Sequence, residues 1–105
     1  MATDWTTVEN NIITAVQAVL GGAWPTVANG ATASIKSLTA ISQYIEANSA
    51  QMTADETQQL TSEWKNAFQH TLTGYAMITA AIAQNAISAA LTVLINAVPA
   101  LAGFV

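Results

Sequence analysis

The residues that could do acid–base or metal chemistry in this chain are few and lie in one stretch. His70 is the single histidine, and Glu56 and Glu63 precede it at steps of seven, which puts all three on one side of a helix. A general base needs a carboxylate partner, but the helical neighbours of His70 are Asn66 and Gly74. Two carboxylates and one histidine without further ligands make a poor metal site. We therefore expect no enzyme, no catalytic residue, and no cofactor or metal site.

The charge composition narrows the classes of partner. The net charge is −4, with two basic residues against six acidic ones, too few cations to follow a phosphate backbone. We therefore expect no specific nucleic-acid binding. Charged residues make up only 8% of the chain, against about a quarter in typical domains, and none occurs after residue 65. Because a soluble monomer normally keeps a charged surface, this deficit indicates a homo-oligomer.

An apolar C-terminal stretch with a polar seam is the strongest candidate for a functional surface. Between Tyr75 and Val98, 18 of 24 residues are apolar. The polar residues that form the seam recur mostly at steps of three and four: Gln84, Asn85, Ser88, Thr92 and Asn96. Such side chains can hydrogen-bond between helices, line the lumen of a ring, or face solvent on an amphipathic helix. All three interpretations stay open.

Small and aromatic residues add two further sets of candidates. Alanines at four-residue spacing allow close approach of helices, although alanine is also the best helix former. These small-residue contacts are predicted at Ala76, Ala80, Ala86 and Ala90. Aromatic anchors for a core or an interface are predicted at Trp5, Trp24 and Trp64.

The elements that must position these residues are helices, so the fold class is all-α in a single domain over residues 1–105. We predict helices at about 4–20, 25–47 and 54–98, forming a helical hairpin or small bundle with one long C-terminal helix. Gly21 and Gly22 end the first helix, Pro25 begins the second, and the Thr53–Glu56 capping box begins the third. At 1.5 Å per residue, their lengths are about 25, 33 and 67 Å.

The length of the third helix raises the question of what covers it. In one arrangement, the first two helices pack side by side on residues 54–75, and residues 77–98 project. In the other, they run end to end and the chain is a long hairpin. Both leave an apolar flank exposed, and such flanks mark interfaces. We therefore expect that a single molecule cannot shelter its uncharged C-terminal third.

A membrane-spanning role for the same stretch is the next alternative. Residues 75–98 are long enough to cross a bilayer of about 30 Å. Six polar residues and the absence of basic flanks disfavour a permanent anchor, whereas conditional insertion by an oligomer stays open. The first residues lack a basic segment followed by an apolar run, so we expect no cleavable signal peptide. The sequence leaves the localisation unknown, with a virion or secretion without a cleavable signal peptide as the two alternatives.

Two resemblances bear on function. In length, acidity and helical outline, the chain resembles the small substrates of type VII secretion systems, although their Trp-x-Gly turn is replaced here by Asn48-Ser49-Ala50-Gln51. Its Ala/Thr/Gln/Asn-rich composition resembles small phage virion proteins that assemble as rings or linings. We expect a structural protein that self-assembles through its C-terminal helix, such as a phage tube, ring or ejection-channel subunit. Its partners would be copies of itself, other virion proteins or a membrane. The alternative is a secreted helical hairpin that acts by partner binding or membrane permeabilisation.

Overall fold

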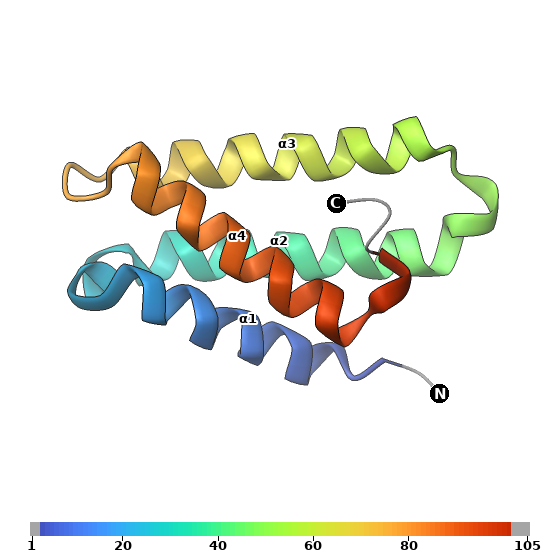
Figure 1. Cartoon of the computed structure of the whole chain (residues 1–105), viewed down its shortest axis with the longest axis horizontal. Helices are drawn as coiled ribbons and strands as arrows, with labels where there is room; N and C mark the ends of the chain where they lie inside the picture. The colour runs from blue at the N-terminus through green and yellow to red at the C-terminus, as the bar shows by residue number, and fades with distance from the viewer. Residues whose placement is uncertain (1–2, 102–105) are drawn as a thin grey trace.

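The computed structural model describes residues 3–101, apart from the side chain of Ala100. Four α-helices lie within this range: α1 (Trp5–Leu20), α2 (Trp24–Asn48), α3 (Ala54–Thr73) and α4 (Ala80–Ala97). Short 3₁₀ turns, η1 (Gly21–Ala23), η2 (Ser49–Gln51) and η3 (Pro99–Leu101), accompany them. Each helix runs opposite to the one before it, and α4 returns to lie beside α1 (Figure 1). The predicted all-α class is confirmed.

The first two helices begin and end close to their predicted bounds. Asp4 caps α1 by accepting a hydrogen bond from the Thr7 backbone N–H at 3.2 Å. Gly21 follows α1 with φ of 53°, a conformation that favours glycine. Helix α2 then starts at Trp24 and continues without a break through Gly30.

Gly30 lies where α2 approaches the end of α3. A Cβ atom at this position would stand 3.1 Å from the Thr71 methyl group and 3.4 Å from the Tyr75 hydroxyl. Glycine in a helix interior costs about 1 kcal/mol relative to alanine. Here the missing side chain allows the two helices to pack closely.

The prediction of one continuous helix over residues 54–98 is wrong. Helix α3 ends at Thr73, and α4 begins only at Ala80. The Gly74 N–H still bonds to the His70 carbonyl, after which the chain turns and Ile78 becomes buried. Thr79 then starts a new helix, because its extended backbone and its Oγ1 atom, which accepts the Ile82 N–H at 3.2 Å, make it an N-cap.

This break also overturns the expectation that one molecule cannot shelter its C-terminal third. Helix α4 folds back between α1 and α3 and packs most extensively on α1. Its inward face is buried, and it consists of Ala83, Ala86, Ile87, Ala90 and Leu94. Helices α1 and α2 lie side by side, as in the first of the two arrangements considered, but residues 77–98 do not project.

The core runs along the axis of the bundle and takes one stripe from each helix. Val8, Ile12 and Val16 recur at four-residue steps on α1, and Phe68 and Leu72 do so on α3. All five are almost completely buried, so the apolar residues at helical spacing are the ones that form the core. The capping box at the start of α3 is present as predicted.

Candidate functional site

The acid–base candidates, Glu56, Glu63 and His70, all lie on α3. His70 is exposed near the end of α3. The Glu56 carboxylate accepts hydrogen bonds from the Thr53 backbone N–H at 3.3 Å and from the Thr53 hydroxyl at 3.2 Å, as a helix-capping residue does. Within residues 3–101, no group of three His, Asp or Glu side chains could hold a metal ion. The absence of catalysis stays a prediction.

The polar seam lies on the outer face of α4. Gln84, Asn85, Ser88, Thr92 and Asn96 are all exposed, on the side of the helix opposite its buried stripe. Ala81 shares this face and is exposed too. Among the described residues, no hydrogen bond joins a seam side chain to another helix, so within one chain the seam does not hold the bundle together.

The four alanines divide into two pairs. Ala86 and Ala90 are fully buried in the stripe of α4 that faces the core, where their small side chains allow close helix packing. Ala76 lies in the turn between α3 and α4, and Ala80 is the first residue of α4; both are exposed.

Of the three predicted aromatic anchors, Trp64 is the one that is buried. Its Nε1–H donates to the Ser34 carbonyl at 2.7 Å, which ties α3 to α2, and its ring lies 5.1 Å from that of Phe68. Trp5 and Trp24 are half-buried and pack against the edge of the core. All three side chains therefore serve the packing of a single chain.

The most informative surface property is a division of charge between the two halves of the bundle. Every exposed residue within α1 and α4 is uncharged, and Glu9, the single charged residue in these two helices, is half-buried. Asp4 lies just outside α1, at its N-terminus. All the remaining charges belong to α2 and α3: Lys36, Glu46, Asp55, Glu56, Glu63 and Lys65.

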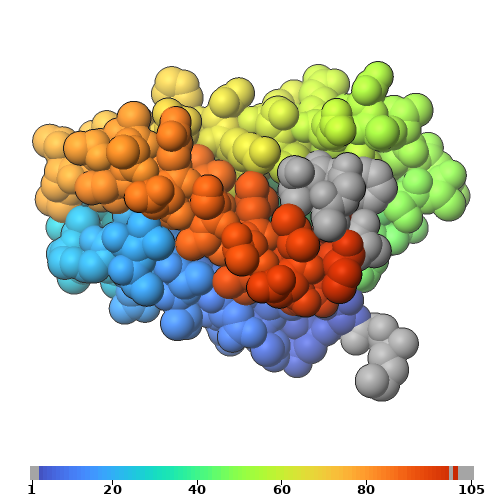
Figure 2. All heavy atoms as spheres, in the orientation of Figure 1, coloured from blue at the N-terminus to red at the C-terminus, as the bar shows by residue number. Residues whose placement is uncertain are grey.

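We call the exposed residues of α1 and α4 the uncharged face. On α4 it consists of the seam together with Ala80, Ala81 and Ala97, and on α1 of Thr6, Thr7, Asn10, Asn11, Thr14, Gln17 and Ala18. Figure 2 shows α4, orange to red, crossing the visible side of the molecule with α1, in blue, along its lower edge. The two helices at the ends of the sequence thus form one continuous surface.

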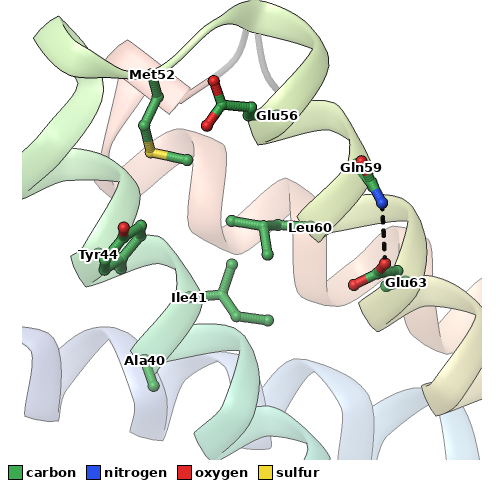
Figure 3. A pocket seen from close by; sticks show the side chains of 8 residues that line it. All are labelled: Ala40, Ile41, Tyr44, Met52, Glu56, Gln59, Leu60 and Glu63. Atoms are coloured by element: carbon green, nitrogen blue, oxygen red, sulfur yellow. Dashed lines mark hydrogen bonds between the residues drawn. The ribbon is translucent and has the colours of Figure 1, made fainter.

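A groove of about 590 Å³ lies on the other half of the bundle, between α2 and α3 near η2. Its apolar residues are Ala40, Ile41, Tyr44, Met52 and Leu60, and its polar residues are Glu56, Gln59 and Glu63. Ile41 and Leu60 point toward each other from the two helices, and Tyr44 and Met52 lie toward one end (Figure 3). Tyr44 is 56% exposed, an unusual state for a large aromatic side chain.

A second, smaller groove of about 380 Å³ separates α3 from α4. Gln84 and Ser88 of the seam line it together with Lys65, Asn66 and Gln69 of α3. Ile87 and Leu91 of α4 also line it, so a groove of mixed polarity separates the uncharged face from the charged half of the bundle.

Helix α4 is also the one helix among the described residues that is long and apolar enough to cross a membrane. Its mean hydropathy is 1.4, and 28% of its residues are buried inside the bundle. The core helix of a soluble protein can have the same length and composition. No protein-family model, curated protein or solved structure matches the chain.

Sequence reasoning missed the α2–α3 groove. Its residues come from two helices, and which side of each helix faces the other depends on how they pack. One local signal was available, because Tyr44 stands beside the apolar stripe of α2, three residues after Ile41. A large aromatic residue at the margin of a stripe lies at the boundary between core and solvent.

Proposed function

We propose that this protein is a structural subunit that assembles with copies of itself through the uncharged face of α1 and α4. The observation that carries the proposal is the absence of any charged side chain among the exposed residues of these two helices. A surface without charge has a low desolvation cost when a second molecule covers it, whereas a charge in a contact must be paired.

The side chains of this face also suit a helix-to-helix contact. Ala81, Asn85, Ser88 and Thr92 follow one line along α4, and all are short. Short side chains lose little rotamer entropy on ordering and allow backbones to approach closely. The Asn, Ser and Thr side chains provide donors and acceptors that a neighbouring copy can satisfy.

The class of assembly that we propose is a tube, ring or channel component of a phage virion. The support is compositional: the chain is rich in Ala, Thr, Asn and Gln, has no cysteine, and has few charges. In such an assembly, the uncharged face would meet the neighbouring subunit and part of the seam would border a hydrated lumen. The buried stripe of α4 is already covered by its own bundle, so subunits would join through the exposed residues of the uncharged face.

A matched pair of charge insertions tests the proposal. Ser88 and Ser62 are both exposed serines, each eight residues after the first residue of its helix, α4 and α3 respectively. Ser88→Glu places a carboxylate in the uncharged face, and Ser62→Glu adds the same charge to the half that already carries charges. Sedimentation velocity over a range of concentrations reports the mass of each variant.

We expect wild type and Ser62→Glu to sediment as multiples of 10.9 kDa and Ser88→Glu to sediment as a monomer. A wild-type protein that stays monomeric at several hundred micromolar would remove self-assembly from consideration. Equal assembly of all three proteins would remove the uncharged face as its contact.

Membrane permeabilisation is the second function that we propose, and it rests on the length and hydropathy of α4. To insert, α4 would have to leave α1 and expose the buried stripe that includes Ala86 and Leu94. Release of dye from neutral liposomes, together with loss of the bundle's thermal transition, would support this function. Intact liposomes at micromolar protein would exclude it.

A further inference from the structure

We infer that the groove between α2 and α3 docks a basic amphipathic helix from a partner protein. The inference is independent of self-assembly, because the groove lies on the charged half of the bundle, away from the uncharged face. Its two carboxylates, Glu56 and Glu63, stand at the border of apolar residues, and the lining includes no cation. The groove therefore combines an apolar contact surface with negative charge.

The spacing of the carboxylates specifies the partner. Glu56 and Glu63 are seven residues apart on α3, which is two helical turns, or about 10.5 Å. Each carboxylate has one oxygen engaged within the chain, since Glu56 Oε1 accepts from Thr53 and Glu63 Oε1 accepts from Gln59. Among residues 3–101, no hydrogen bond engages the second oxygen of either carboxylate, and a cation could bind there. A partner helix with Lys or Arg at positions i and i+7 matches this spacing.

Between the two carboxylates, the groove offers apolar contacts. Ile41 and Leu60 are half-buried, and Met52 adds an adaptable thioether side chain at one end. Apolar residues at i+3 and i+4 of the partner helix would face this surface between its two cations. The exposed Tyr44 ring is the largest side chain there, and aromatic residues at such positions often dominate binding.

Charge also decides against other occupants. The cations of this chain are Lys36 and Lys65, which belong to α2 and α3 and lie 29 residues apart, so no single helix of a second copy presents two. Anionic lipid headgroups would be repelled by the carboxylates. A basic helix from a different protein is the occupant that both the apolar and the charged residues of the groove favour.

The test uses a fluorescein-labelled helical peptide of about 16 residues, long enough to span the groove. It carries two lysines seven apart and leucines between them on the same face, with Ala and Gln elsewhere. A control peptide has glutamate in place of both lysines. Fluorescence anisotropy of the full-length protein titrated into each peptide measures affinity at low and at physiological salt.

Two matched pairs of variants accompany the wild type. Glu56→Gln/Glu63→Gln removes the groove carboxylates, and because glutamine also serves at the third position of a capping box, the start of α3 is kept. Glu46→Gln/Asp55→Asn removes equal charge outside the lining residues. Both double changes take the net charge from −4 to −2. Tyr44→Ala is matched by Met77→Ala, since Met77 is 50% exposed and lies outside the groove.

We expect saturable binding of the lysine peptide by the wild type, weakened about 2- to 30-fold by the loss of two exposed ion pairs in Glu56→Gln/Glu63→Gln. Tyr44→Ala should weaken binding at least as much, and both controls less than about 2-fold. The proposal is overturned if the wild type does not bind, or if it binds both peptides equally. It is also overturned if the two charge-neutralising variants behave alike, since net charge would then explain the attraction. Sedimentation of the same proteins reports self-assembly separately.

Discussion

Truncation of Leu94 tests whether α4 belongs to the bundle. Leu94 has no exposed surface and lies in the last turn of α4, on the stripe that faces the core. The next buried residues are Val98, just before η3, and Leu101, the last residue of η3, which packs on α2. This end of α4 is therefore held in place, and a cavity at position 94 should collapse only in part.

The expected cost follows from this burial. Leu→Ala changes in cores destabilise proteins by about 2–5 kcal/mol, and the upper values occur where the surroundings relax least. An unfolding entropy of about 2.1 cal/mol/K per residue corresponds to about 0.22 kcal/mol/K for 105 residues. Leu94→Ala should therefore lower Tm by about 9–23 °C. The free energy of unfolding of such a domain is about 5–15 kcal/mol, so the variant loses a large share of it.

Thermal unfolding and urea unfolding, each followed by circular dichroism at two protein concentrations, measure the Tm and the free energy of unfolding. Thr92→Ala is the control, because Thr92 is exposed two residues earlier in the same helix and its truncation should change the free energy of unfolding by less than about 0.5 kcal/mol. A loss below about 0.5 kcal/mol for Leu94→Ala would refute the packing of α4 in the bundle. So would a loss that depends on protein concentration, since Leu94 would then be buried only between molecules.

Two further predictions concern the helix starts. Thr79→Ala should destabilise the protein by about 1 kcal/mol in thermal unfolding, because it removes the acceptor of the Ile82 N–H. Thr79→Ser keeps this acceptor and should leave the stability unchanged. A gain in stability on Thr79→Ala would instead indicate a continuous helix, in which alanine is favoured. The hydrogen bonds from the Thr7 side chain and then the Thr7 backbone lower the pKa of Asp4 below its usual 3.8. The ionised carboxylate therefore stabilises the fold above about pH 3.8, and this contribution is lost as the pH falls through the lowered pKa. The Tm difference between wild type and Asp4→Asn should therefore shrink in acid, and a difference that stays constant from neutral pH to about pH 2 would contradict this role.

The ends of the helices show how far local sequence signals reach. Asp4, Gly21 and the Thr53 capping box act through neighbours within a few residues, so the first two helices and the start of α3 were predictable. The end of α3 was not. Gly74 has φ of −64°, a conformation open to any residue, and a threonine five residues later is compatible with a helix interior as well as with an N-cap.

Packing decided between these two uses of the same residues. With a break, Ile78 becomes buried and α4 can place Ala86 and Leu94 against α1. A continuous helix would have left this apolar stripe in water, at a cost of roughly 25 cal/mol for each Å² of exposed apolar surface. The free energy gained by burying this stripe comes from contacts between the two ends of the sequence, which helical periodicity cannot indicate.

By itself, the sequence determined the all-α class, the apolar stripes, the caps, and the absence of charge after residue 65, because each depends on residue type and short-range spacing. Only the tertiary structure decided that α4 returns to α1, that the seam faces outward, and that Glu56 and Glu63 border a groove with Tyr44. The physical reason is that burial of apolar surface selects one arrangement of helices, and that arrangement decides which polar side chains from distant segments share a surface.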